Sequence, residues 1–413
     1  ETYNYYIAHG ILPSSTGYNV NMGTDFDVLE VPEFGPQSSD PTKAEIVLLH
    51  ASPDAPNVDV RARDGGTVVS DLGYGEYDII ELDPVGFLMD LTTVGGPAGE
   101  ALFTFNLRTT VLSQLVGNKV ITVAGGFVDS TANNDGPDFI GNTVLALPSV
   151  LPLEEVTTAS VQIVHNSPDP AASAVDVYYN ADATPTLDDF AYQQASGKVD
   201  LLANTDVRLS VNPGTSTGTN DGALLENDNF RLLAGEEYFV VVDGFADPMM
   251  YEANPDGNST ALQIYSKIAE TREPDADTAY LHVFHGATDA PGVDLVETAL
   301  NLTVVDGATY GNFSGEIPLA DGTYELELQA DADNSTLADY QSLPVSGLLG
   351  ANHLLVASGF LTPSDANGDP AGDFFVGVAP NAGGALDPLS IVTGRADLNI
   401  ATVGAYPNPA TET

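Results

Sequence analysis

The chain has 413 residues, which is too long for one ordinary sandwich domain and predicts about three domains. Its 59 acidic and 11 basic residues give a formal net charge of −48, which argues against nucleic acid and anionic lipid as partners because both would be repelled. The chain has no cysteine, so disulfide scaffolds, cysteine-bound zinc and thiol catalysis are excluded. No apolar run reaches the roughly 18 residues that a membrane helix needs, and no membrane insertion is expected.

The first segment, residues 1–43, is expected to be a strand segment or an incomplete repeat. Tyr3–Gly10 (YNYYIAHG) resembles the opening strand of the repeats described next, with His9 in the position of their histidine. His9 lies only 41 residues before His50, which is too few for another sandwich. Either this segment adds strands to the first domain, or it leaves an unsatisfied strand edge.

One phrase occurs three times and sets the domain organisation. It reads IVLLHASPDAPNVDV at Ile46–Val60, VQIVHNSPDPAASAVDV at Val161–Val177 and LHVFHGATDAPGVDL at Leu281–Leu295. The histidines of successive copies are 115 and 120 residues apart, a spacing that suits a whole β-sandwich domain rather than a solenoid unit.

A second phrase follows later in each copy, as a Val- and Leu-rich strand that runs into Gly-Phe. Its copies are Lys119–Asp129 (KVITVAGGFVD), Glu237–Pro248 (EYFVVVDGFADP) and His353–Pro363 (HLLVASGFLTP). The glycine allows a bulge or a tight bend. Between the two phrases lie short β-type runs separated by Gly, Pro, Asn and Asp, so the sequence predicts an all-β chain of tandem antiparallel β-sandwich domains.

Stretches rich in proline and charge give the domain boundaries. The expected units are a first β-sandwich repeat at 44–153, a second at 159–270, a third at 277–392, and a linker with the start of a tail at 393–413.

The phrase H-x-S-P-D-A-P-x-V-D-V resembles a bacterial and archaeal family known as domain of unknown function 4397, over most of residues 44–390. The resemblance implies extracellular domains, often in tandem, with an immunoglobulin-like sandwich. The third copy departs from the phrase, with Ala287–Thr288 in place of Ser-Pro, and the second has extra residues between Pro170 and Val175. These departures argue against an active site in this loop.

The C-terminal stretch Leu398–Thr413 (LNIATVGAYPNPATET) is similar to the start of the C-terminal sorting domain of the Bacteroidota type IX secretion system. Tyr406–Ala410 matches the recurrent opening of such domains. This resemblance implies export by a Gram-negative bacterium to the cell surface or the extracellular medium.

The histidine and two aspartates of each repeated phrase are candidate site residues. They are His50, Asp54 and Asp59, then His165, Asp169 and Asp176, and finally His285, Asp289 and Asp294. A Ser-His-Asp site would need the Ser52 hydroxyl on the imidazole, and the third copy has Ala287 at that offset. Strand parity places each histidine with the inward apolar residues. We therefore expect a buried imidazole that bonds an aspartate or the loop backbone and braces the turn, and no catalytic residue.

Loops rich in oxygen ligands follow the Gly-Phe strands and are candidate calcium sites. The third loop places Asp365, Asn367, Asp369 and Asp373 at positions one, three, five and nine of a calcium loop. The corresponding residues are Asp129, Asn133, Asp135 and Asp138 in the first copy, and Asp247, Asn254, Asp256 and Asn258 in the second. No loop has the full pattern with its terminal glutamate, so calcium binding and plain turn formation both stay open.

The leading hypothesis is an exported, non-enzymatic surface or extracellular protein, namely a stalk, an adhesin or a filament subunit. Its partner would be a second copy or another surface component, bound by strand addition through residues 1–43. The alternative is a calcium-assisted glycan-binding module. An aromatic platform for a glycan would draw on Tyr5, Tyr6, Tyr178, Tyr179 and Tyr192, since the chain has no tryptophan.

Overall fold

The structure is a computed structural model that describes residues 3–12, 15–20, 25–34, 37–97, 99–146, 149–180, 182–363 and 374–391. Strands dominate it, which confirms the all-β prediction. Its only α-helix within these residues is α1 (Thr109–Leu115). No helix in this part of the chain is long and apolar enough to cross a membrane.

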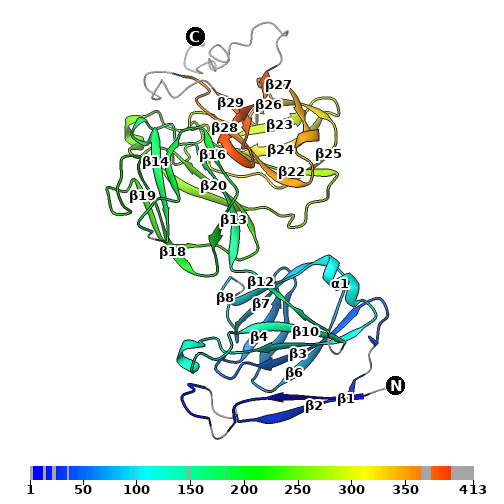
Figure 1. Cartoon of the computed structure of the whole chain (residues 1–413). Coiled ribbons are helices and arrows are strands. Elements are labelled where there is room, and N and C mark those ends of the chain that lie inside the picture. The colour runs from blue at the N-terminus through cyan, green and yellow to red at the C-terminus, as the bar shows by residue number, and fades with distance from the viewer. Residues whose placement is uncertain are drawn as a thin grey trace, which may run out of the picture. The chain divides into compact units, whose positions relative to one another are not determined.

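The chain forms two compact units. Unit 1 comprises Glu1–Thr158 with the short segments Leu202–Thr205 and Leu232–Gly235, and unit 2 comprises the rest. Unit 1 contains one sandwich and an N-terminal hairpin, and unit 2 contains two sandwiches (Figure 1).

The first sandwich packs two five-stranded sheets, with the orders β11-β10-β9-β3-β6 and β12-β8-β7-β4-β5. Alternation along the histidine strand directs Ile46 and Leu48 into the apolar core between the sheets. The strands are β3 (Ala44–Ala51), β4 (Val58–Ala62), β5 (Gly66–Leu72), β6 (Tyr77–Leu82), β7 (Phe87–Thr93), β8 (Ala101–Leu107), β9 (Lys119–Gly125), β10 (Ile140–Ala146), β11 (Ser149–Pro152) and β12 (Glu154–Glu155).

The second sandwich has one sheet of order β21-β20-β13-β16-β30, in which β17 also pairs with β13, and one of order β15-β14-β18-β19. Its strand β30 (Ala382–Ala385) comes from the far end of the chain and adds to the edge strand β16. The others are β13 (Thr158–His165), β14 (Ala174–Tyr179), β15 (Leu187–Ala191), β16 (Gln194–Gly197), β17 (Val199–Leu202), β18 (Asp206–Pro213), β19 (Leu225–Arg231), β20 (Glu237–Asp243) and β21 (Gln263–Ile268).

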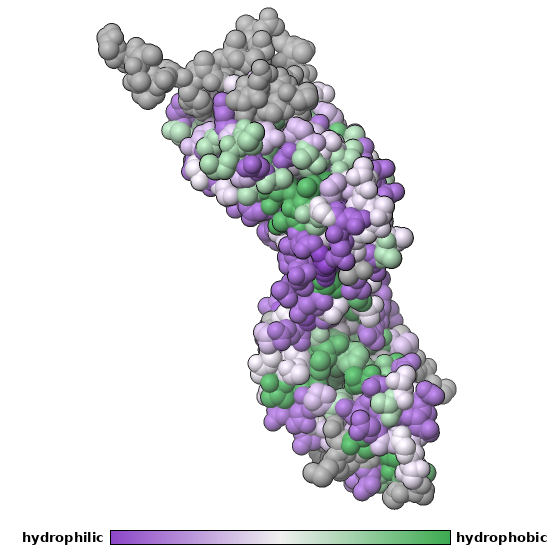
Figure 2. Space-filling view, turned by 90° about the vertical axis from the view of Figure 1, so that its left-hand side faces the viewer, coloured by the Kyte–Doolittle hydropathy of each residue, from purple (hydrophilic) through white to green (hydrophobic). Residues whose placement is uncertain are grey.

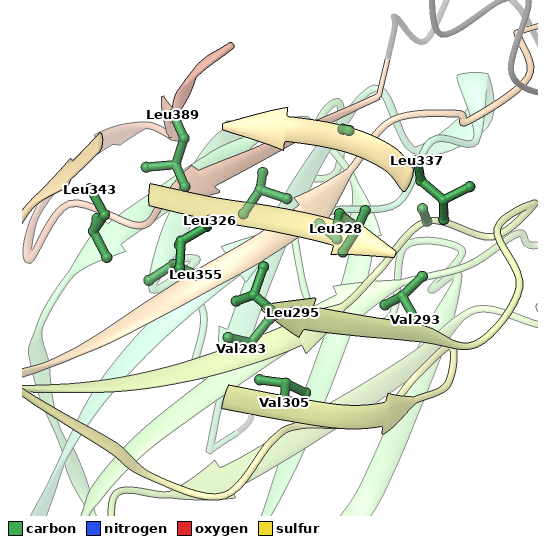
Figure 3. Close-up of a cluster of buried hydrophobic side chains, with 14 of the residues drawn as sticks. Val283, Val293, Leu295, Val305, Leu326, Leu328, Leu337, Leu343, Leu355 and Leu389 are labelled. Carbon is green, nitrogen blue, oxygen red and sulfur yellow. The ribbon is translucent and has the colours of Figure 1, made fainter. Parts of the chain in front are cut away.

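The third sandwich has the sheet orders β25-β22-β28-β29-β31 and β24-β23-β26-β27-β32. Side chains such as Val283, Leu295 and Leu328 from both sheets fill its core (Figure 3). The strands are β22 (Thr278–His285), β23 (Val293–Glu297), β24 (Leu302–Ala308), β25 (Ile317–Ala320), β26 (Thr323–Ala330), β27 (Thr336–Pro344), β28 (Ala351–Ser358), β29 (Phe375–Val378), β31 (Asp387–Pro388) and β32 (Ser390–Ile391).

The two repeated phrases lie side by side in every sandwich. The histidine strand and the Gly-Phe strand pair in parallel as β3 with β9, β13 with β20, and β22 with β28. Each sandwich therefore departs from a purely antiparallel arrangement at this one central pair, because a long connection separates the two strands in sequence.

The N-terminal hairpin consists of β1 (Tyr3–His9) and β2 (Asp27–Phe34), which pair with each other in a separate two-stranded sheet. It lies against the outer face of the sheet that contains β3 and β9 (Figure 1), where Val31 packs on Val47 and Ile121. The segment 1–43 therefore covers the first sandwich without extending either of its sheets within the described residues.

Candidate functional site

The histidine that ends each histidine strand bonds the backbone of the loop that follows it. His50 Nε2 donates to the carbonyl oxygen of Pro56 at 3.0 Å, and His50 Nδ1 accepts from the backbone N–H of Ser52 at 3.3 Å. The corresponding distances are 2.6 Å from His165 Nε2 to Ala172 O and 3.0 Å from His285 Nε2 to Pro291 O. In His50, where Nδ1 accepts and Nε2 donates, this geometry requires the neutral imidazole with its proton on Nε2.

Burial favours the same neutral form. It lowers the pKa of His50 and His285 and lowers the pKa of His165 to about 4, because a charged imidazole in the core would lose its hydration. His50 also borders a cavity of about 120 Å³, whose walls are almost wholly apolar and include Leu48 and Phe105. This cavity is part of the apolar interior of the first sandwich.

The first aspartate of each phrase caps the turn after the Gly-Phe strand. Asp54 accepts hydrogen bonds from the backbone N–H groups of Val128 and Asp129, both at 2.9 Å. The corresponding bonds run to Asp169 from Ala246 N–H at 2.8 Å, and to Asp289 from Leu361 and Thr362 N–H at 2.9 and 2.8 Å. The two repeated phrases are thus tied together by the same carboxylate in all three sandwiches.

The second aspartate of each phrase accepts a backbone N–H from the neighbouring strand or the turn after it. Asp59 accepts from Asp71 and Gly95, each at 2.9 Å, and these two bonds hold its pKa below the usual value. The corresponding bonds run to Asp176 from Asp189 N–H at 2.9 Å and to Asp294 from Gly307 N–H at 2.7 Å.

Ser52 does not form the chain of hydrogen bonds that a catalytic triad needs. Its hydroxyl donates to the Gly126 carbonyl oxygen at 2.8 Å and lies 3.2 Å from Asp54 Oδ1, and the residue is fully buried. The imidazole of His50 accepts a hydrogen bond from the backbone N–H of Ser52 and not from its hydroxyl.

A tyrosine beside each histidine was missed in the sequence. The ring centroids of His50 and Tyr74, of His165 and Tyr192, and of His285 and Tyr310 are each 6.3 Å apart in edge-to-face geometry. The sequence does contain a spacing that could have revealed them, since each tyrosine follows its histidine by 24 to 27 residues. It is weak because, between the repeated phrase and the tyrosine, no other residue is identical in all three copies.

The predicted calcium ligands of the first loop mostly form turns. Asp129 accepts from the Thr131 hydroxyl and the Ala132 N–H, and the amide nitrogen of Asn133 donates to Asp54. Among the second-loop residues, Asn254 donates to the carbonyl oxygens of Thr288 and Ala290. The third-loop residues lie outside the described part of the chain: Asp365, Asn367, Asp369 and Asp373. Asp135 and Asp138 belong to the turn between β9 and β10.

A different acidic cluster forms in the third sandwich, where Asp294 meets Asp306 and Asp331. Their carboxylate oxygens all lie within 4.8 Å of one another. Asp306 also lines a surface hollow of about 450 Å³ that includes Asn312 and Glu316. Sequence reasoning named only Asp294, because the other two lie on separate strands and connections of the second sheet.

Neither adjacent pair of the tyrosines expected in a glycan platform exposes both rings on one face. Tyr178 and Tyr179 are buried in the second sandwich, and Tyr5 of the hairpin is half-buried against the first sandwich. Tyr6 lies on the opposite face of the hairpin. Adjacent tyrosines on a strand point to opposite faces, so neither pair presents two rings to one ligand.

Taken together, the fold defines a tandem β-sandwich protein. A family model described as "Domain of unknown function (DUF4397)" matches residues 159–296, from β13 to β23, and so includes the histidine phrases of the second and third sandwiches. No curated protein matches the chain. A solved structure, the Bacillus anthracis TIE protein, aligns with 8% identity and a TM-score of 0.17 over 77% of this chain and 50% of that chain, so the chain spans half of that structure and the likeness carries no argument.

Proposed function

We propose that this chain is an exported, non-enzymatic structural protein of the cell surface or the extracellular space, such as a stalk, an adhesin or a filament subunit. The observation that supports it best is the use of the repeated His and Asp side chains. In each sandwich they bond backbone groups of the fold, as with His165 and Ala172 O or Asp289 and Leu361 N–H.

The surface chemistry agrees with an extracellular role. Hydrophilic residues cover much of the face seen in Figure 2, between scattered hydrophobic patches. With a net charge of −48, such a surface stays hydrated and resists nonspecific association. The similarity of Leu398–Thr413 to a sorting domain supports export by a Gram-negative bacterium, and these residues lie outside the described part of the chain.

Antibody labelling of intact cells, viewed by electron microscopy, tests the location. We expect label on filaments or a coat at the cell surface, and label confined to the cytoplasm would contradict the proposal. A hydrolase substrate panel tests the absence of catalysis. Turnover that disappears in His165→Ala, while the melting temperature stays unchanged, would identify an enzyme instead.

Residues 1–43 are proposed to mediate association with a second copy. Within the described residues β1 and β2 form a two-stranded sheet of their own, and a strand at the edge of a sheet can accept a further strand. Deletion of residues 1–43 is therefore expected to convert oligomers into monomers, as measured by sedimentation velocity. An unchanged distribution of oligomers would contradict this assembly role.

The acidic cluster of Asp294, Asp306 and Asp331 favours a second candidate, a calcium-assisted glycan-binding module. Three carboxylates beside a polar hollow are ligands that suit Ca²⁺. Titration with Ca²⁺ by calorimetry, compared with Asp331→Asn, tests the ion, and a glycan array with and without chelator tests the ligand. Binding of neither Ca²⁺ nor glycan would remove this candidate.

A further inference from the structure

Lys198, the residue between β16 and β17, lies at the boundary between the second and third sandwiches of unit 2. The outer faces of these two sandwiches pack on each other, since Phe239 of β20 and Leu354 of β28 belong to one buried cluster (Figure 1). The backbone N–H of Lys198 donates to the carbonyl oxygen of Asn381, which follows the third sandwich's strand β29. The lysine side chain can therefore contact groups from both sandwiches.

Two polar residues meet at this boundary because they occupy the same position of the repeated Gly-Phe strand. Each stands seven residues before the glycine of its Gly-Phe pair, as Glu237 in the second sandwich and as Asn352 in the third. Alternation along the strand directs each side chain to the outer face, which Phe239 and Leu354 share two residues further on. The packing of the two outer faces thus brings a carboxylate of one sandwich against an amide of the other.

The carboxylate of Glu237 contacts the side-chain nitrogen atoms of both Lys198 and Asn352. Its Oε1 forms an ion pair with Lys198 Nζ at 2.6 Å, and its Oε2 accepts a hydrogen bond from Asn352 Nδ2 at 3.2 Å. Lys198 Nζ also donates to the backbone oxygen of Asn352 at 3.2 Å, so the amine lies against the residue that carries the amide. An amine, a carboxylate and a primary amide are therefore in contact in that order.

The side chain of Asn352 is buried, and its hydrogen bonds fix the orientation of the amide. The residue is 1% exposed, whereas the side chains of Lys198 and Glu237 are 22% and 21% exposed. Asn352 Nδ2 donates to the carbonyl oxygen of Thr271 at 2.9 Å as well as to Glu237, which places the amide nitrogen beside the carboxylate. The amide oxygen Oδ1 accepts no hydrogen bond from the described residues. A buried polar atom without a partner is rare in folded proteins and calls for an explanation beyond packing.

We propose that Lys198 and Asn352 form an intramolecular amide bond that links the second and third sandwiches, with Glu237 as the catalytic base and acid. Glu237 Oε1 takes a proton from Lys198 Nζ, and the neutral amine attacks the side-chain carbonyl carbon of Asn352. A bond from Nζ to this carbon forms, and the bond from the carbon to Nδ2 breaks. Nζ loses two protons in all, and Glu237 passes both to Nδ2, which leaves as ammonium. Glu237 ends as a carboxylate, and no oxidant or other reactant is consumed.

The bond would hold the two sandwiches together when their buried cluster is disrupted. A covalent cross-link restricts the unfolded chain, and it does so more strongly when it joins residues far apart in the sequence. Lys198 and Asn352 belong to separate sandwiches, so the link spans much of unit 2. The inference goes beyond the proposed function and does not depend on it, because the bond forms within one chain.

The mass of the intact, denatured full chain tests the proposal. Loss of ammonia lowers the mass by about 17 Da, and we expect this deficit in the wild type. Lys198→Arg and Glu237→Gln should each have the full mass calculated from their own sequences. Lys119→Arg is the matched control, because Lys119 forms an ion pair with Glu45 inside the first sandwich, and this variant should keep the deficit. Circular dichroism checks that every variant is folded.

A protease digest of the same samples identifies the bond, because succinimide formation at an asparagine also releases ammonia. We expect one cross-linked peptide that contains both Lys198 and Asn352 in the wild type and in Lys119→Arg. A wild-type chain at its full sequence mass, or a deficit that persists in Lys198→Arg, would overturn the proposal. The same cross-linked peptide in Glu237→Gln would overturn the catalytic role of Glu237.

Discussion

The second and third sandwiches cover each other's outer faces, whereas the first sandwich relies on a two-stranded hairpin. Among the described residues, the shared cluster in unit 2 holds ten buried apolar residues, including Phe239 and Phe284, against three between the hairpin and the first sandwich. Hydrophobic stabilisation grows with the apolar area removed from water. The outer face of the sheet that contains the histidine strand therefore contributes very different amounts of stability in the two units. The hydrogen bonds of the repeated His and Asp residues are nearly alike in all three sandwiches.

The largest expected effect comes from removing an aromatic ring from the cluster in unit 2. Phe284 is fully buried, so Phe284→Ala should lower the free energy of unfolding by about 4 kcal/mol through lost burial and a residual cavity. Val47→Ala, beneath the hairpin, should cost about 2 kcal/mol or less. Urea unfolding measures both, and equal losses would remove the contrast between the two outer faces.

Loss of the first aspartate of the repeated phrase should lower the stability of all three sandwiches to a similar extent. Asp169→Ala removes the acceptor of the Ala246 N–H and the Ala171 N–H, and leaving these groups unpaired should cost about 3 kcal/mol. The exposed Asp188→Ala is the control and should change stability by less than about 0.5 kcal/mol. A loss below about 1 kcal/mol for Asp169→Ala would show that the cap is dispensable.

Acidification should destabilise the sandwich interiors through the histidines. The folded-state pKa of His165 is about 4, below the ordinary value of 6.5, so the unfolded chain binds the proton first as the pH falls. Stability is full above pH 6.5 and is lost toward pH 4, by roughly 2 kcal/mol between pH 7 and pH 5 for this one group.

The melting temperature of His165→Gln, followed over the same range, isolates that contribution. Its pH dependence should be shallower than that of the wild type, whatever its stability at pH 7. Identical slopes would mean that the imidazole takes up its proton as easily in the fold as in the unfolded chain.

The smallest effect concerns a buried carboxyl group that the first sandwich lacks. Asp243 is fully buried at the outer face of the second sandwich, where Gly125 stands in the first, and burial raises its pKa well above the ordinary value. Above that ordinary value the unfolded chain has lost the proton and the folded chain keeps it, so stability falls as the pH rises.

Asp243→Asn removes this titration and should raise the free energy of unfolding by about 1 kcal/mol at pH 8, with a smaller gain at pH 5. Melting temperatures at pH 5 and pH 8 measure this change in stability, with the exposed Asp188→Asn as the control. An equal gain in stability at both pH values would mean that the substitution acts through packing and not through titration of Asp243.

The repeated phrases in the sequence were sufficient to predict the all-β class and the inward direction of the histidine side chains. Parity along a strand is a local property, so residues such as Ile46, Leu48 and His50 could be assigned to one face from the sequence. The parallel pairing of the two phrases and the acidic cluster around Asp306 were decided only in the tertiary structure. Each of these features depends on contacts between segments that lie far apart in the sequence. Burial of apolar faces selects those contacts, but the alternating pattern of one strand does not show which other segment it will contact.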